Sequence, residues 1–415
     1  MGRLPIEWSS PTRVRMNGRD FLAFGGCNYL GLGSHPAVVE ALTQAARSLG
    51  ISTTASRETT GNTLSHEGLE RELAAFMGQE AAILGAEGYT ANFMALQTLA
   101  LTHRVAIIDS HAHRSLRHAA VAAGLHVCEF EHLNARSARW LATQHADSGV
   151  VILTDSVFAA DGAVAPLADL LAVLPPHRST LLVDDCHGFC VLGRGGRGAV
   201  DAAGLRDPRV VITTTLAKGL GCYGGAVLGR RAFIDSVQQH AWVYRSSTPV
   251  PPAIAEACRA AVRVLGQGDE LVAKLRGNIQ VMREVLFFTG LQMPPDGVPI
   301  FTFAVSDEER QQRVHDMLLE AGVFAPLIEY PGGPAQRYFR VVVNAMHTHD
   351  EINTLGKHLI RALDRTRDQR PAKRPRPPVQ EPSENANEKS QASERPEMPD
   401  VTVLSRQVLE QLSGM

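Results

Sequence analysis

The chain has 415 residues, 44% of them hydrophobic and 20% charged, and its formal net charge is −2. This balance gives no electrostatic reason to expect a nucleic acid or an anionic membrane as partner. No apolar run reaches the roughly 20 residues of a membrane-spanning helix, and the first residues lack the apolar core of a secretion signal. The six cysteines are dispersed without a CxxC pair, which predicts reduced thiols in a cytoplasmic protein, with neither disulfides nor zinc ligands.

The hydrophobic pattern predicts alternating helices and strands. Amphipathic helices are expected at 37–48 and 66–77, and a long one at 252–287. Six short apolar runs are expected to be strands, at 81–84, 105–109, 149–155, 180–185, 210–215 and 224–229. Several of these runs are apolar on both faces, as strands of a buried parallel sheet are. The pattern therefore indicates a doubly wound α/β domain whose ligand lies at the carboxyl ends of its strands.

These elements divide the chain into four parts. Residues 1–48 are expected to be an N-terminal segment, 49–251 a large domain, and 252–364 a smaller α+β domain. Residues 365–415 are rich in proline and charge and poor in large apolar residues, so we expect a disordered tail. Its last residues, VTVLSRQVLEQLSGM, have the pattern of a short amphipathic helix.

Polar side chains gather where the predicted strands end. An isolated aspartate at such a point is usually a turn former or helix cap, but here four strands end this way. The residues are Asp109, His111, His113, Asp155, Asp184, His187, Thr215 and Lys218. The HAH triplet at 111–113 lacks a carboxylate–histidine partner at helical spacing, so we expect no metal there. GRGGRG (193–198) is more simply a turn than a nucleotide loop.

Lys218 has an unusual setting for a lysine. It follows the apolar run VVITTT and stands among Ala217 and Gly219. A lysine in a protected pocket can lose its proton and form a Schiff base. Pyridoxal phosphate is a partner for such a lysine, and it requires a carboxylate at its ring nitrogen and donors for its phosphate. Asp184 can supply the carboxylate. Thr215 and the GAEGYT turn (85–90) can supply the phosphate donors.

At this point the chain resembles the α-oxoamine synthases, pyridoxal-phosphate enzymes of fold type I. The group includes 8-amino-7-oxononanoate synthase, aminolevulinate synthase, aminoketobutyrate CoA ligase and serine palmitoyltransferase. The resemblance spans roughly residues 20–364 and rests on an ordered series of motifs. These are NYLGLGSHP (28–36), SRETTGNTLSHEGLE (56–70), AEGYTAN (86–92), DSHAHRSL (109–116), DSVFAADGAVAPL (155–167), VDDCHGFCVLGRGGRG (183–198), TTLAKGLGCYGG (214–225) and RVVVNAMHTHDEI (340–352).

The resemblance implies a role for each matching residue. Lys218 would hold the cofactor as a Schiff base, and His113 would stack on its ring. Asp184 would pair with the ring nitrogen, and His187 would hydrogen-bond the phenolic oxygen. The phosphate would be held by Gly88, Tyr89 and Thr215, joined by Ser247 or Thr248 of a neighbouring subunit. Asp155 would lie at the cofactor, and Asn28 and Arg340 would hold the amino-acid carboxylate. A homodimer with shared sites is implied.

The expected reaction is the decarboxylative condensation of alanine, serine or glycine with an acyl thioester, carried by coenzyme A or a carrier protein. An 8-amino-7-oxononanoate synthase-like activity is the first expectation, and a serine palmitoyltransferase-like activity or another acyl chain is the alternative. The family often has glutamate at position 155, serine at 159 and a glycine-rich run where this chain has ISTTA (51–55), so the substrate stays open. From other classes, an aminotransferase or aldolase, or a non-catalytic partner subunit, also stays open.

Overall fold

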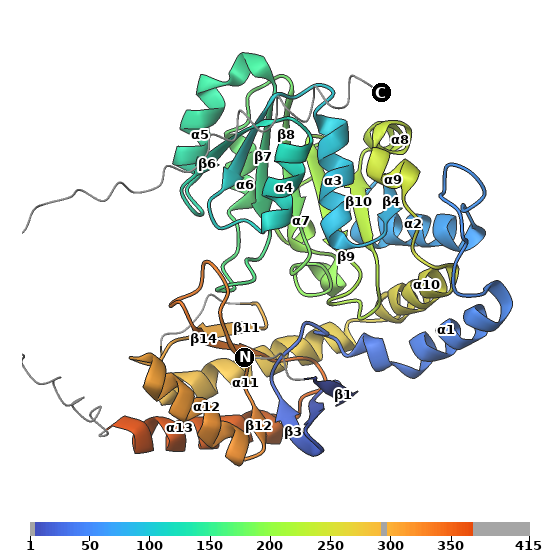
Figure 1. Ribbon diagram of the computed structural model, residues 1–415. Helices are drawn as coiled ribbons and strands as arrows, with labels where there is room; N and C mark the ends of the chain where they lie inside the picture. The colour runs from blue at the N-terminus through green and yellow to red at the C-terminus, as the bar shows by residue number, and fades with distance from the viewer. Residues whose placement is uncertain (1–4, 292–296, 368–415) are drawn as a thin grey trace, which may run out of the picture. The chain divides into compact units, whose positions relative to one another are not determined.

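A seven-stranded sheet forms the centre of the larger, upper part of the ribbon in the computed structural model, which describes residues 5–291 and 297–367 (Figure 1). Its strands are, in order across the sheet, β4 (Ala81–Gly85), β10 (Gly225–Gly229), β9 (Val210–Thr215), β8 (Ser179–Asp184), β7 (Val150–Asp155), β5 (Val105–Asp109) and β6 (His126–Phe130). Neighbours from β9 to β6 run parallel, whereas β10 runs antiparallel to both β4 and β9. The prediction of a mostly parallel sheet in an α/β body is confirmed.

Apolar side chains cover both faces of this sheet. Successive side chains of each strand point to opposite sides, so each strand contributes to both faces. Ile107 and Ile152 face one apolar core, and Ile108 and Val151 face the other. The second core is covered by α3 (Gly88–Leu99), α4 (Arg114–Ala122), α8 (Arg231–His240) and α9 (Trp242–Ser246). The first is covered by α2 (Leu64–Met77), α5 (Ala135–Gln144), α6 (Leu167–Ala172), α7 (Ala199–Ala202) and α10 (Pro252–Gly266). Polar groups are thereby left to the ends of the strands.

Two smaller sheets lie outside the central one. The first contains β1 (Glu7–Ser10), β2 (Arg13–Met16), β3 (Arg19–Ala23) and β12 (Val323–Phe324). The second contains β11 (Ile300–Phe303), β14 (Tyr338–Val342) and β13 (Leu327–Ile328). Because β3 pairs in parallel with β12, the N-terminal strands belong to the same sheet as a strand made about 300 residues later.

The remaining helices belong mainly to the C-terminal part. They are α11 (Glu270–Thr289), α12 (Glu308–Glu320) and α13 (His349–Arg367), while α1 (Pro36–Leu49) packs along α10. Three short 3₁₀ turns are η1 (Leu32–Ser34), η2 (Ala146–Ser148) and η3 (Arg194–Gly196).

The expected single helix at 252–287 is wrong, because it is two helices, α10 and α11, separated by residues 267–269. The sequence Gly266-Gln267-Gly268 explains the break, since glycine disfavours helix by about 1 kcal/mol relative to alanine. The helices expected at 37–48 and 66–77 are confirmed as α1 and α2. The amino end of α2 has a capping box between Thr63 and His66.

The C-terminal helix α13 continues past the expected domain end at 364 to Arg367. The remainder of the predicted tail and its terminal amphipathic helix lie outside the described residues. Among the helices that are described, none combines the length and the apolar character that crossing a bilayer requires.

Candidate functional site

Lys218 lies in the turn between β9 and β10, and its small neighbours are required by close packing. A Cβ added at Gly219 would come within 2.5 Å of the Cys190 Cβ. The turn therefore lies directly on the segment that follows β8. The Lys218 Nζ lies 2.8 Å from Nε2 of His187, which comes from that same segment. Amine and imidazole are in contact at the carboxyl ends of two neighbouring strands.

A cavity of about 250 Å³ contains this pair. Eight of the residues predicted from the sequence line it, namely Gly88, Tyr89, His113, Asp155, Asp184, His187, Thr215 and Lys218. They come from the ends of β5, β7, β8 and β9 and from the start of α3. The sheet edge thus brings together an amine, two carboxylates, two imidazoles and two hydroxyls in one space.

Asp184 is held by a buried amide that the sequence reasoning did not single out. The Asn92 Nδ2 donates to Asp184 Oδ2 at 2.8 Å and to the Ser115 Oγ at 2.9 Å. Thr213 Oγ1 donates in turn to the Asn92 Oδ1. Asn92 is fully buried on α3, so this bond is made out of water and fixes the carboxylate plane. Asn92 ends the quoted motif AEGYTAN, which was the only sequence signal for it.

His113 begins α4 and is fixed from two sides. Its Nδ1 lies 2.7 Å from the Ser115 Oγ, and its backbone N–H donates to both carboxylate oxygens of Asp155, at 3.1 and 3.2 Å. Burial lowers the pKa of His113, which favours the neutral ring. Burial and the charge of Asp184 raise the pKa of Asp155 well above its usual value. Through its two hydrogen bonds from the backbone N–H, Asp155 positions the backbone of His113.

The start of α3 forms an anion cradle next to Thr215. The first N–H groups of a helix have no partners within the helix and favour negative charge. A Cβ added at Gly88 would lie 2.7 Å from the Cβ of Thr215, so only glycine allows this approach. Tyr89 stands edge-on to the His113 ring, with ring centroids 6.3 Å apart, and its hydroxyl pairs with Nδ1 of His118.

A second missed residue, Tyr29, reaches His187 from the N-terminal segment. Its phenol oxygen lies 2.6 Å from His187 Nδ1, and the whole side chain is buried. Burial lowers the pKa of His187 well below its usual value, and the nearby Lys218 lowers it further. His187 is therefore neutral, and its two ring nitrogens contact Tyr29 and Lys218 respectively.

Arg340 lines neither this cavity nor a second one of about 360 Å³, but it contacts a lining residue of each. Its Nε donates to the backbone oxygen of Ala159, which lines the first cavity, at 2.8 Å. A second guanidinium nitrogen lies 4.0 Å from the Cys27 Sγ, which lines the second cavity. The two cavities also share Ala217 as a wall.

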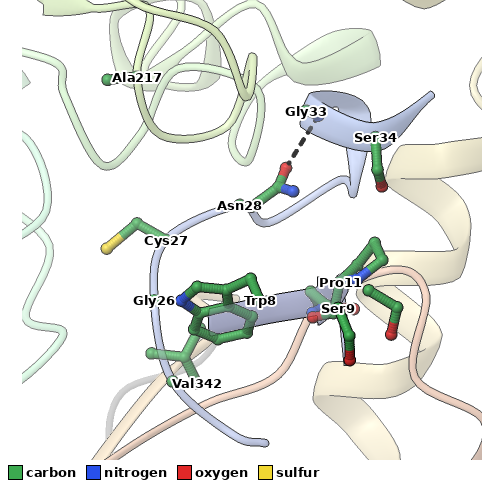
Figure 2. A pocket seen from close by; sticks show the side chains of 13 residues that line it. Trp8, Ser9, Pro11, Gly26, Cys27, Asn28, Gly33, Ser34, Ala217 and Val342 are labelled. Carbon is green, nitrogen blue, oxygen red and sulfur yellow. Dashed lines mark hydrogen bonds between the residues drawn. The ribbon is translucent and has the colours of Figure 1, made fainter. Parts of the chain in front are cut away.

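Asn28, which was predicted to bind a carboxylate, lies in the second cavity. Figure 2 shows its side-chain oxygen turned toward the backbone N–H of Gly33, 3.4 Å away, with Trp8 and Val342 on the opposite wall. Ser247 and Thr248 line neither cavity of their own chain. Ser247 donates to the backbone oxygen of Val243, and Thr248 is exposed.

These groups fit pyridoxal phosphate. Lys218 would be the amine for its aldehyde, and Asp184, a buried carboxylate held in one orientation by Asn92, would face its ring nitrogen. The start of α3 at Gly88 would receive its phosphate. The fit rests on the Cβ-free approach at Gly88 and on the Asn92–Asp184 bond, both of which are built features of this cavity.

Comparisons with known proteins agree with the fold. Residues 19–359 match the family described as aminotransferase class I and II. A putative 8-amino-7-oxononanoate synthase of Desulforudis audaxviator is 35% identical over 86% of this chain and 94% of its own length. The 8-amino-7-oxononanoate synthase of Thioalkalivibrio sulfidiphilus is 34% identical over 86% of this chain and 91% of its own.

Solved structures resemble the chain as well. The serine palmitoyltransferase of Sphingomonas wittichii matches with a TM-score of 0.81 and 26% identity, over 86% of this chain and 91% of the other. The 8-amino-7-oxononanoate synthase of Francisella tularensis matches in fold with a TM-score of 0.72 at 23% identity, over 83% and 98% respectively.

Proposed function

Because the chain belongs to the aminotransferase class I and II family, and within it to the α-oxoamine synthases, we propose that it condenses a small amino acid with an acyl thioester. The products are an aminoketone, carbon dioxide and the free thiol. The observation that carries the proposal is the contact of Lys218 with His187 inside a cavity that Asp184 also lines. Pyridoxal phosphate, when bound, supplies an electron sink for a carbanion at the amino-acid α carbon.

Lys218 has two tasks in this proposal. Its amine would hold the aldehyde of the cofactor, and as a free amine it would take the α proton of the amino acid. The contact with His187 keeps Nζ at the floor of the cavity, at the carboxyl end of β9. Asp184 holds a proton at the ring nitrogen, with its orientation fixed by Asn92. His187 donates to the phenolic oxygen, and His113 covers the ring.

The remaining residues bind and orient the reactants. The start of α3 at Gly88 and Tyr89, together with Thr215, binds the phosphate. Arg340, which contacts a lining residue of each cavity, binds the amino-acid carboxylate together with Asn28, which lines the second cavity. The second cavity, which shares the lining residue Ala217 with the first, offers room for the acyl donor.

The identities near 35% with 8-amino-7-oxononanoate synthases support alanine and a pimeloyl thioester as the first substrates to test. Serine with a long-chain thioester is the second pair, supported by the 26% identical serine palmitoyltransferase. Each amino acid is offered with short, pimeloyl and long-chain thioesters, and thiol and carbon dioxide are measured together. We expect both in equal amounts. Turnover with a keto acid, and no thiol from any thioester, would identify an aminotransferase instead.

We also infer a cytoplasmic homodimer. The hydroxyls of Ser247 and Thr248 lie outside the cavities of their own chain, which supports a role in a partner's phosphate site. Mixing an inactive Lys218→Ala chain with an inactive Ser247→Ala/Thr248→Val chain tests this. Recovery of activity on mixing is expected, because mixed dimers regain one intact site. A monomer by sedimentation, or no recovery in proven mixed dimers, would contradict shared sites.

A further inference from the structure

Three metal-ligating side chains meet at the edge of the central sheet, far along β6 from the cavity. They are His126, Cys128 and His145, and their ligand atoms all lie within 4.8 Å of one another. The Cys128 Sγ lies 3.8 Å from the Nε2 of His145. No role in the proposed reaction uses any of the three.

The backbone explains why they meet. His126 and Cys128 are two residues apart on a strand, so their side chains leave the same face of the sheet. That face is covered by α5, and His145 is the residue that directly follows the last residue of α5. His126 pairs with Val105 at the amino end of β5, whereas the cavity lies at the carboxyl ends of the strands that run parallel to it. The cluster and the cavity therefore lie at opposite ends of the same strands.

The donor set suits zinc. Zinc binds thiolate at about 2.3 Å and imidazole at about 2.0–2.1 Å in tetrahedral sites, which places a sulfur and a nitrogen ligand about 3.6 Å apart. The observed 3.8 Å is close to this separation. His126 is exposed, so an ion can enter from solvent and water can fill the fourth position. Spacings of 2 and 17 residues form no familiar metal motif, which is why the sequence predicted no zinc.

A second cluster, His111, His132 and Asp161, lacks this freedom. Nδ1 of His132 already lies 2.8 Å from Asp109, and the His111 and His132 rings are stacked with centroids 4.1 Å apart. Burial opposes the charge on His132, but Asp109 and Asp161 raise its pKa to about 9. A protonated imidazole offers no lone pair to a metal, so this cluster is an ion pair.

We propose that His126, Cys128 and His145 bind one Zn²⁺ ion that joins the edge strand β6 to the carboxyl end of α5. On binding, the Cys128 thiol loses its proton to solvent and its sulfur bonds the metal, while the imidazoles bind as neutral ligands. An edge strand has unpaired backbone groups on its outer side. A metal that holds β6 against α5 stabilises the part of the sheet with the fewest neighbours.

The test uses the full chain, stripped of metal by a chelator and then titrated with Zn²⁺ against a chromophoric chelator. One equivalent is expected to bind. Co²⁺ replaces Zn²⁺ as a spectroscopic probe, and a thiolate-to-cobalt charge-transfer band is expected. Cys128→Ser is expected to abolish the band and to weaken Zn²⁺ binding at least tenfold. His126→Gln and His145→Gln are expected to weaken Zn²⁺ binding by at least the same factor. Zn²⁺ is also expected to raise the melting temperature of the wild type and not of these variants.

Two matched controls separate the cluster from other ligands. Cys27→Ser removes a thiol outside the cluster, and His240→Gln removes an exposed histidine on α8 near the other sheet edge. Both should bind like the wild type. The melting temperature without metal shows whether each variant folds. A band that survives Cys128→Ser, or the absence of stoichiometric Zn²⁺ binding by the folded wild type, would overturn the proposal.

Discussion

The phenol of Tyr29 and the imidazole of His187 are joined by a buried hydrogen bond, with 2.6 Å between the phenol oxygen and Nδ1. Burial raises the pKa of Tyr29, so the phenol keeps its proton and donates it to Nδ1. His187 is neutral, and its own proton is then on Nε2, the nitrogen that faces Lys218 and the cavity. Tyr29 thus selects the tautomer that can donate to a phenolic oxygen.

Tyr29→Phe should remove the hydrogen bond that selects the tautomer of His187. We expect His187 in the cofactor-free protein to show both tautomers in its nitrogen NMR shifts, where the wild type shows Nε2–H alone. Turnover should fall about tenfold, the equivalent of one hydrogen bond of about 1.4 kcal/mol. The pH at which the bound cofactor changes its absorption should also move. A variant with the wild-type tautomer and absorption would leave Tyr29 a packing residue only.

Lys218→Ala is expected to bind pyridoxal phosphate without becoming covalently attached to it. Borohydride reduction followed by peptide mapping should label Lys218 in the wild type and no lysine in the variant. The chain has four other lysines, Lys274, Lys357, Lys373 and Lys389. The exposed Lys274→Ala is the matched control and should be labelled at Lys218 like the wild type. A label on any other lysine would remove the central assignment.

Asp184→Asn should fold and bind the cofactor but lose exchange of the substrate α proton with deuterated solvent. The expected loss is on the order of 10²–10³-fold, the scale of one removed electrostatic contact in an active site. The neighbouring Asp185 is the control, because it bonds the backbone N–H of Ala199 and does not line the cavity. Asp185→Asn should keep the exchange rate. Equal rates in Asp184→Asn and the wild type would contradict a role at the ring nitrogen.

His132 should make stability depend on pH. Its pKa of about 9 in the folded protein exceeds the ordinary value of 6.5, with the closest partner, Asp109, at 2.8 Å and Asp161 at the longer 3.7 Å. The pair therefore stabilises the fold fully below about pH 6.5, by up to about 3 kcal/mol, and less as pH rises through about 9. His132→Gln should lose that amount at pH 6 and much less at pH 10, by urea denaturation. The exposed His177→Gln should show no such difference.

The last residues of α13 are expected to limit how far the chain can be shortened from its C-terminus without loss of stability. Thr366 is buried, and its Oγ1 accepts from the Nε of Arg310 at 3.2 Å. A chain ending at Asp364 loses this bond, and we expect it to be less stable than one ending at Arg367 by about 1–2 kcal/mol. Both should bind cofactor and turn over substrate, because α13 lines neither cavity. Loss of activity in the chain ending at Arg367 would assign a function to residues 368–415.

The sequence predicted the elements whose pattern is strong and local. All six apolar runs are strands, and six of the eight polar residues predicted at their ends line one cavity. Asp109 and His111 do not line it, and Asp109 pairs with His132 instead. The edge strand β6 was missed because its sequence, HVCEF, has no continuous apolar run. As an edge strand, β6 leaves most of these side chains exposed or half-buried. Tyr29 and Asn92 were missed as site residues because their partners, His187 and Asp184, lie 158 and 92 residues away. Such pairing depends on the tertiary fold and leaves no periodic trace in the sequence.

The parallel pairing of β3 with β12 has a consequence for the order in which the protein matures on the ribosome. Residues 22–23 find their partners, Val323 and Phe324, only after more than three quarters of the chain has been made. The central sheet, whose strands end at Gly229, can assemble earlier, since domains generally fold as units from the N-terminal side during synthesis. The segment with Asn28 and Tyr29, which follows β3, is therefore expected to reach its final position after the central sheet has formed. The site should therefore be completed late in synthesis, when β3 pairs with β12.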